Sequence, residues 1–307
     1  MSEPVIEIEN LTRQFKRNRA LDNVSLTIPR GSVFGLIGEN GAGKTTLMKH
    51  ILGMLKAELG SVKVFGIDPV ENPAEALGRI GYLSEDRDLP VWMRIDEYLN
   101  FRRAFFPQWD DDYTRQLVAD FNLDCKQKIG SLSRGQLARV GLIAAIAHHP
   151  DLLVLDEPSS GLDPAVRNDI LSAIIRTVAD DGRTVLFSSH LLDEVQQVSD
   201  HVALLIDGRL AVSEPIDDYL SRHTRWTLRL QQPLDQMPQI DGVINCSGDG
   251  LEWKFLCKGS VGALESWVNS SGAEVIDRAT PALDEIFVDF LRPATNGFSA
   301  FSASKES

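Results

Sequence analysis

Residues 38–46 read Gly-Glu-Asn-Gly-Ala-Gly-Lys-Thr-Thr, and this stretch decides the fold. It fits the pattern G-x4-G-K-[ST] at every fixed position, and its glycines let backbone N–H groups converge on a phosphate. The apolar run before it, residues 33–37, predicts a buried strand. Apolar residues after it share one helix face, at Leu47, Met48, Ile51, Leu52 and Leu55. A strand, a phosphate loop and a helix in this order predict an α/β nucleotide-binding core, with phosphate at the helix start.

The side chains of this loop have separate expected roles. In such loops the lysine, here Lys44, reaches the β- and γ-phosphates, and the hydroxyl of Thr45 binds Mg²⁺. We expect nucleotide contacts from most of the loop, at Gly38, Asn40, Gly41, Ala42, Gly43, Lys44, Thr45 and Thr46.

A second apolar run ends in two acidic residues. Residues 152–155 are apolar without alternation, which predicts a central parallel strand covered on both faces, and Asp156 and Glu157 follow directly. Ligands gather at the carboxyl ends of strands in such sheets. We expect Asp156 to hold Mg²⁺, directly or through water, and Glu157 to act as general base on an attacking water. The alternative, two acids that only cap a helix, is disfavoured by the phosphate loop and by Pro158.

The chain is acidic and long enough for one large domain or two smaller ones. It has 307 residues, 43% of them hydrophobic, and a net charge of −13. Nucleic-acid binding without sequence preference draws on Lys and Arg, so no nucleic-acid partner is expected. The three cysteines are far apart and predict neither a zinc site nor a disulfide framework. The cysteine pattern favours a reduced cytoplasmic setting, and the polar, acidic residues 1–10 show no secretory signal.

With these motifs the chain resembles the ATP-binding-cassette (ABC) ATPase family over about residues 3–215. Leu-Ser-Arg-Gly-Gln at 132–136 is similar to the signature loop of that family. Ser-Ser-Gly-Leu-Asp at 159–163 is similar to its D-loop. His190, which follows the apolar run 184–187, resembles its switch histidine.

Two further positions extend the resemblance. Phe15 lies where the family has an aromatic residue that stacks on adenine, and Glu85 falls near its Q-loop glutamine. Glu85 is acidic where glutamine is usual, so its assignment as a metal ligand is open. For Phe15, packing under an N-terminal sheet is the alternative. Arg134 replaces the usual middle glycine of the signature, and we interpret it as a tolerated substitution whose side chain points away from the phosphates.

The resemblance implies ATP and Mg²⁺ as ligands and assigns a role to each motif. Lys44, Glu157 and His190 would be catalytic, and Thr45, Asp156 and Glu85 would hold the metal. The remaining nucleotide contacts would come from Phe15 and from the residues Ser133, Gly135, Gln136 and Asp163. In the family, the signature closes on the γ-phosphate of ATP held by another subunit, so two copies, or a pair with a related subunit, are expected.

The expected domains follow from the motifs and the composition. Residues 3–220 form a phosphate-loop NTPase core with a parallel sheet, an N-terminal antiparallel β-subdomain and a helical subdomain at about 86–150. Residues 221–292 predict a small α+β appendage, with strands at 226–230, 243–246, 251–256 and 274–276 and a helix at 261–269. The Ser- and Ala-rich residues 293–307 predict a disordered tail.

These features predict the ATP-hydrolysing subunit of an ABC transporter. The longest uncharged apolar stretch, residues 140–147, is far below the roughly 18 residues of a membrane span. We therefore expect a separate permease. The resemblance implies that it docks on the helical subdomain, between Glu85 and Phe106, and holds this chain at the cytoplasmic face. The end of the chain, residues 281–290, resembles ATPases of ABC-2-type exporters. A soluble, non-transport ABC ATPase is the alternative, and a phosphate-loop kinase or GTPase is disfavoured by the signature and His190.

Overall fold

The computed structural model describes residues 3–16, 18–234 and 238–291, and the chain divides into two compact units after Pro215. The sequence placed this boundary after residue 220. It lies earlier because helix α8 (Ile216–Ser221) belongs to the second unit, directly after the last strand of the first. The tail predicted at 293–307 lies outside the described residues.

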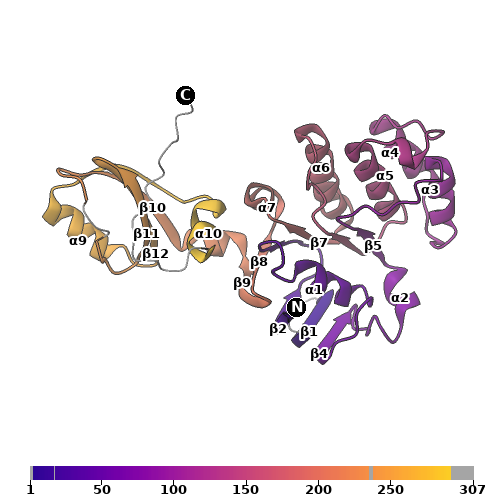
Figure 1. The fold of residues 1–307 in the computed structure, drawn as a ribbon, viewed down its shortest axis with the longest axis horizontal. Helices are drawn as coiled ribbons and strands as arrows, with labels where there is room; N and C mark the ends of the chain where they lie inside the picture. Colours follow the sequence, from indigo (N-terminus) through magenta and orange to yellow (C-terminus); the bar gives the residue numbers. More distant parts are fainter. Residues whose placement is uncertain (1–2, 17, 235–237, 292–307) are drawn as a thin grey trace. The chain divides into compact units, whose positions relative to one another are not determined.

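The first unit is built on a six-stranded sheet in the order β5-β6-β7-β3-β8-β9 (Figure 1). Its strands are β3 (Val33–Ile37), β5 (Ile80–Leu83), β6 (Leu152–Leu155), β7 (Thr184–Ser189), β8 (His201–Ile206) and β9 (Arg209–Pro215). All neighbours are parallel except β8 and β9, which form a hairpin through Asp207 and Gly208. Every residue of β3, β6 and β7 is buried, as expected for central strands covered on both faces. The α/β core predicted from the sequence is therefore confirmed.

A second, three-stranded antiparallel sheet has the order β2-β1-β4. Its strands are β1 (Ile6–Phe15), β2 (Asn18–Ile28) and β4 (Leu59–Val64). Helix α1 (Lys44–Ile51) lies between this sheet and the parallel sheet (Figure 1). Leu47, Met48 and Ile51 of α1 share one buried core with both sheets. This core fixes the phosphate loop, which joins β3 to α1.

Helices complete the first unit. They are α2 (Pro73–Leu77), α3 (Ile95–Arg103), α4 (Asp111–Asp120), a 3₁₀ turn (Ile129–Ser131), α5 (Arg134–Ile146), α6 (Pro164–Asp181) and α7 (Leu192–Val198). Helices α3, α4 and α5 lie together as the helical subdomain (Figure 1). Helix α5 packs against β5 and α6, while α6 and α7 both pack against β7 and β3. Helix α5 is buried along most of its length, so it anchors the signature loop at its start.

The second unit is an antiparallel sheet with helices, as the sequence predicted. Its strands, in the order β11-β12-β10-β13, are β10 (His223–Arg229), β11 (Val243–Asp249), β12 (Glu252–Lys258) and β13 (Glu274–Ala279). Its other helices are α9 (Gly262–Ser271) and α10 (Leu283–Leu291). Leu264 and Val268 of α9 pack on Trp226 and Phe255 of the sheet. Across the described residues of both units, no helix is long and apolar enough to cross a membrane.

Candidate functional site

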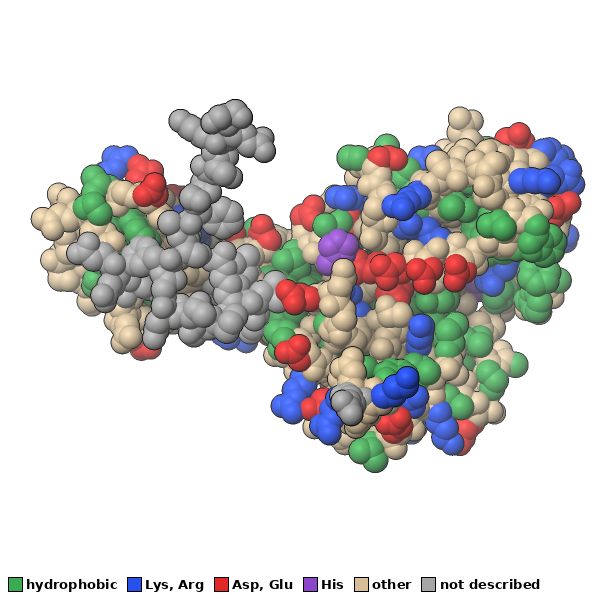
Figure 2. Space-filling view, in the orientation of Figure 1, with side chains coloured by type: hydrophobic (Ala, Val, Ile, Leu, Met, Phe, Trp, Pro, Cys, Tyr) green, Lys and Arg blue, Asp and Glu red, His purple; other side chains and the backbone are tan. Residues whose placement is uncertain are grey.

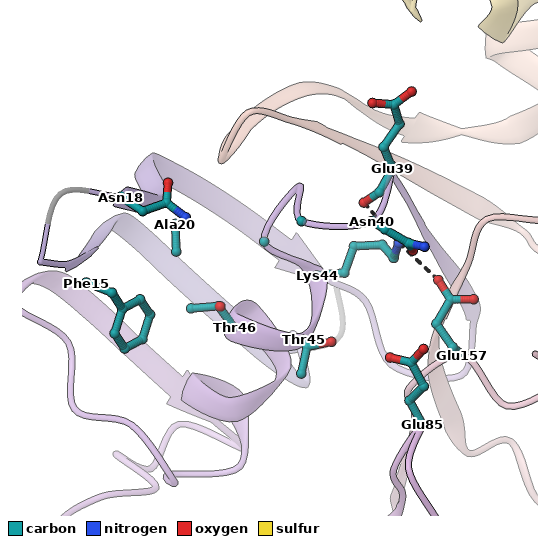
Figure 3. A pocket seen from close by; sticks show the side chains of 12 residues that line it. Phe15, Asn18, Ala20, Glu39, Asn40, Lys44, Thr45, Thr46, Glu85 and Glu157 are labelled. Atoms are coloured by element: carbon teal, nitrogen blue, oxygen red, sulfur yellow. Dashed lines mark hydrogen bonds and ion pairs between the residues drawn. The ribbon is translucent and has the colours of Figure 1, made fainter.

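A cavity of about 450 Å³ lies over the phosphate loop and the carboxyl end of the parallel sheet. Its walls come from the phosphate loop, the N-terminal sheet and the segments after β5 and β6 (Figure 3). The lining residues are Phe15, Asn18, Ala20, Glu39, Asn40, Gly41, Gly43, Lys44, Thr45, Thr46, Glu85 and Glu157. Gly38 and Ala42 were predicted as contacts but do not line it. Gly38 packs close to the carbonyl of Leu205, and Ala42 is buried, so both shape the loop from beneath.

The loop needs glycine where it turns into α1. Gly43 caps the helix with φ +108°, and a Cβ there would lie 2.4 Å from the carbonyl oxygen of Ala20. A side chain at this position would therefore force the loop away from the N-terminal sheet. Gly41 also has a positive φ, of +88°. The backbone thus adopts conformations that only glycine takes at low cost.

Lys44 links the two motifs that the sequence singled out. Its Nζ donates to the carbonyl oxygen of Gly38 at 2.6 Å and forms an ion pair with Oε1 of Glu157 at 3.0 Å (Figure 3). The predicted loop lysine and the predicted general base are therefore neighbours. Lys44 lines the cavity, and the lysine of such a loop can neutralise phosphate oxygens.

Glu157 is held at both carboxylate oxygens. Oε2 accepts a hydrogen bond from Nδ1 of His190 at 2.6 Å, and Oε1 pairs with Lys44. The backbone of Glu157 has φ +45°, a left-handed conformation that is rare outside glycine. Its N–H donates to Oγ of Ser188 at 2.9 Å. A carboxylate fixed in this way at the edge of the cavity can accept a proton from a bound water.

Asp156 is buried at the same strand end but does not line the cavity. Oγ of Ser188 donates to Oδ1 of Asp156 at 2.7 Å, so one hydroxyl of β7 serves both acids of β6. None of the sequence motifs assigns a role to Ser188. Its position could have indicated a role, because Ser188 lies at the same strand end as His190, two residues before it.

The acids near Thr45 have the donor chemistry of a magnesium site. Thr45 and Glu85 line the cavity, and Asp156 lies near enough to Glu85 to act on its charge. Burial and the carboxylates of Asp156 and Glu157 raise the pKa of Glu85. A cation would relieve this repulsion, and hydroxyl and carboxylate oxygens are the ligands that Mg²⁺ takes. Within the described part of the chain, no three His, Cys, Asp or Glu side chains could hold a metal by themselves.

Phe15 lies on the wall of the cavity nearest the N-terminal sheet (Figure 3). The residue is 40% exposed, which disfavours the alternative of a ring packed under the sheet. The guanidinium of Arg13 lies 4.7 Å from the centre of its ring. An exposed aromatic ring in this place can stack on a base.

The signature residues lie away from this cavity. Ser133 is the N-cap of α5, because its hydroxyl accepts the N–H of Gln136 at 3.2 Å. The Gln136 side chain in turn accepts the N–H of Ser133 at 3.0 Å. A Cβ on Gly135 would lie 2.7 Å from Val166, so this glycine lets α5 approach α6. The Ser133 hydroxyl uses a lone pair in the cap, and its proton remains able to bind a phosphate.

Asp163 lies at the start of α6, at the end of the loop formed by residues 159–163. Oδ1 of Asp163 accepts the N–H groups of Ala165 and Val166, each at 3.1 Å, and so caps α6. The side chain of Arg134 lies against this loop, since its Nη1 would be 3.3 Å from a Cβ placed on Gly161. Arg87, which belongs to none of the sequence motifs, donates to the carbonyl oxygens of Pro158 and Ser160 at 2.9 and 3.1 Å. Two guanidinium groups therefore border the loop that leads to Asp163.

The fold and the cavity together define a phosphate-loop ATPase core. Residues 21–160 match the family model described as ABC transporter. The bacitracin transport ATP-binding protein BcrA of Enterococcus faecalis is 31% identical over 230 residues, 73% of this chain and 74% of that protein. An uncharacterized ABC transporter ATP-binding protein of Synechocystis sp. is 30% identical over 282 residues, 89% of this chain and 78% of that protein.

A solved structure gives the same result. The ATP-binding subunit of an ABC transporter superposes with a TM-score of 0.65 at 26% identity, over 70% of this chain and 91% of that chain. The chain belongs to the family of ABC transporter ATP-binding proteins. It is an ATPase subunit, and the family resemblance drawn from its sequence is confirmed.

Proposed function

We propose that this chain binds ATP with Mg²⁺ in the 450 Å³ cavity, hydrolyses it as one half of a pair, and drives a separate permease as part of an exporter. The observation that carries the proposal is the division of the motif residues between two places. Lys44 and Glu157 line the cavity and His190 holds Glu157 from outside the lining, whereas Ser133 and Asp163 cap the separate starts of α5 and α6.

Hydrolysis is assigned to the residues around Glu157. Its carboxylate accepts a proton from the attacking water, an effect typically worth about 10²–10⁴-fold. His190 donates Nδ1–H to Oε2 of Glu157 and so orients the base, and its partly exposed ring would contact the γ-phosphate. Lys44 exchanges its ion pair with Glu157 for the phosphates, which frees Oε1 for the water.

Binding is assigned to the rest of the cavity. Phe15 stacks on the base, and the loop residues Asn40, Gly41, Gly43, Thr45 and Thr46 surround the phosphates. Thr45, Asp156 and Glu85 would hold Mg²⁺, either directly or through water. When bound, the metal supplies positive charge to the phosphate oxygens as bonds to phosphorus change.

The pair is assigned to the signature and to Asp163. A phosphate-binding helix start at Ser133, Gly135 and Gln136 that does not line its own chain's cavity fits an ATP held by another copy or by a related subunit. Asp163, which caps α6 close to Gly135, would organise the crossed interface. Each ATP would then lie between the phosphate loop of one chain and the signature of the other.

Docking to a permease is assigned to the segment between Glu85 and Phe106. Four large apolar side chains of this segment are exposed: Val91, Trp92, Phe101 and Phe105. Phe101 and Phe105 also touch each other edge to face, with ring centres 5.0 Å apart. Figure 2 shows hydrophobic side chains gathered on the part of the surface where Figure 1 draws α3. Exposed apolar patches of this kind mark interaction sites, and this one would hold the chain at the cytoplasmic face of a membrane.

The test is the variant Glu157→Gln, which removes the general base but keeps its shape. We expect ATP hydrolysis to fall by about 10²–10⁴-fold and an ATP-bound dimer to accumulate. The rate of hydrolysis is measured as released phosphate. The molar mass is measured by light scattering after size exclusion with saturating ATP and Mg²⁺. The matched control is Glu39→Gln, since Glu39 also lines the cavity but points away from Lys44 and Glu157 (Figure 3). A monomer under these conditions would contradict the proposed pair.

A further inference from the structure

Glu194, in α7, is a buried acid to which neither the motifs nor the proposed chemistry assigns a role. It is 2% exposed and does not line the cavity. Three side chains from different parts of the chain converge on its carboxylate: Ser159, Arg167 and Ser189. Burying a charge is costly unless it is paired and hydrogen-bonded, so such a cluster has to be satisfied in one arrangement.

Two of these partners bracket the loop that carries Asp163. Oγ of Ser159 donates to Oε2 of Glu194 at 2.5 Å, at the start of the loop. Nε of Arg167 pairs with Oε1 at 3.0 Å, one turn into α6, and the N–H of Arg167 donates to the carbonyl of Asp163. One carboxylate therefore holds the residues on both sides of Asp163.

The third partner belongs to the strand end that carries His190. Oγ of Ser189 donates to Oε2 of Glu194 at 3.3 Å and also accepts the N–H of Leu191 at 3.0 Å. Ser189 and Leu191 are the two neighbours of His190. The contact thus sets the backbone on both sides of the histidine that holds Glu157.

Burial raises the pKa of Glu194, while the two hydroxyls and Arg167 act in the opposite direction. The side chain of Arg167 is 31% exposed, whereas that of Glu194 is buried. The ion pair between them therefore runs from the protein interior to the surface of α6. The cluster is therefore a single connection between β7, the loop at 159–163 and the start of α6.

We propose that Glu194 is a positioning residue for ATP hydrolysis, which fixes His190 and the loop carrying Asp163 in one arrangement. The inference rests on the proposed roles of His190, Glu157 and Asp163. Glu194 acts through these residues, because it contacts neither the cavity nor Glu157. A catalytic group displaced by about 1 Å can lose about 10²-fold in rate even when the altered residue is remote.

The first test is Glu194→Gln in the full chain. The glutamine amide keeps the shape of the side chain but has no negative charge to pair with Arg167. Its NH₂ group is a donor and cannot accept a hydrogen bond from Ser159 or Ser189. We expect kcat for ATP hydrolysis to fall by about 10- to 100-fold with KM and the Kd of fluorescent ATP unchanged. The matched control is Asp193→Asn, an exposed acid at the neighbouring position of α7, which should hydrolyse ATP at the wild-type rate.

A second pair of variants tests the connection without removing the buried acid. Ser159→Ala should lower kcat by a smaller factor than Glu194→Gln. The double variant should be no slower than Glu194→Gln alone, because the hydroxyl acts through the carboxylate. Arg167→Lys should retain more activity than Arg167→Gln, since it keeps a cation beside Oε1.

The outcomes separate this inference from the proposed function. Wild-type kcat in folded Glu194→Gln would overturn the inference and leave the proposed function standing. Independent, multiplying effects of Ser159→Ala and Glu194→Gln would also overturn it. If Glu194→Gln does not fold, a wild-type kcat in both Ser159→Ala and Arg167→Gln would overturn the inference. A wild-type chain that binds ATP but does not hydrolyse it would instead overturn the proposed function.

Discussion

Nζ of Lys44 lies 3.0 Å from Oε1 of Glu157, and the two side chains are 5% and 4% exposed. This buried pair joins the phosphate loop to the strand end of β6, two motifs more than a hundred residues apart in the chain. His190 occupies the other carboxylate oxygen of Glu157. Lys44, assigned to the phosphates, and Glu157, assigned to the attacking water, therefore hold each other in position at the cavity.

The pair predicts a stability effect that is separate from catalysis. Removing one partner of a buried ion pair leaves an uncompensated charge, which typically costs about 3–5 kcal/mol. Because His190 still supports Glu157, we expect Lys44→Ala to lose about 3 kcal/mol in urea unfolding without nucleotide. The double variant Lys44→Ala with Glu157→Gln should be more stable than Lys44→Ala alone. Losses that simply add would show that the pair is not coupled. Lys44→Ala should also abolish ATP binding.

Ser133 should be separable into a structural and a functional role. Ser133→Ala removes the N-cap of α5 and should cost about 1 kcal/mol of stability. Ser133→Asp keeps a good cap but places a negative charge where a phosphate would bind. We expect this variant to unfold like wild type in urea yet to form no dimer with ATP in the Glu157→Gln background. A dimer of normal stability would place Ser133 outside the interface.

Phe15 should contribute to affinity for the base and not for the phosphates. Loss of one base–aromatic stack costs about 1–3 kcal/mol, so Phe15→Ala should raise the Kd for ATP by about 5- to 150-fold. Phe15→Trp retains a ring and serves as the control. Isothermal titration with inorganic triphosphate should give the same Kd for all three proteins. A matching loss for triphosphate would mean that Phe15 shapes the loop instead.

Glu85 should make stability depend on pH. Its pKa is raised in the folded chain, so ionising it destabilises the fold as the pH rises through that value. Below the usual pKa of glutamate the group is protonated in both states and this cost disappears. Glu85→Gln should therefore raise Tm near neutral pH without Mg²⁺, and the gain should shrink on acidification. Asp88→Asn, an exposed acid nearby that is not among the charges raising the pKa of Glu85, is the control. A gain that persists at low pH would point to a cause other than charge.

Trp92 should matter for partner binding alone. It is 70% exposed, and removing an exposed side chain usually changes stability by about 0.5 kcal/mol or less. Trp92→Ala should keep the ATPase activity of the isolated chain but lose a multi-span membrane protein on detergent co-purification. Leu59→Ala, equally apolar and 66% exposed but on β4, should keep it. Equal recovery with both variants would place the docking surface elsewhere.

Much of the site could be predicted from short stretches of sequence. The phosphate loop is a local motif, since its glycines, Lys44 and Thr45 act through backbone shape and neighbouring atoms. The strand ends at Asp156 and His190 follow from apolar runs and their last residues. Their meeting follows because parallel strands end at one edge of a sheet. The pair of Glu157 and His190 is the direct result.

Other parts required the folded chain. Arg87 contacts residues about 70 positions away, and Glu194 collects partners from β7, the loop at 159–163 and α6. No local pattern distinguishes these residues from ordinary surface charges. The boundary after Pro215 likewise depends on which unit α8 packs with.

The sequence by itself determined the class of protein, the phosphate loop and the residues at the two strand ends, because these depend on local backbone geometry and on the period of apolar residues. Only the tertiary structure decided that Phe15 faces the cavity and that Glu194 ties the loop carrying Asp163 to the strand end carrying His190. These relations depend on how distant segments pack, which no spacing along the chain encodes.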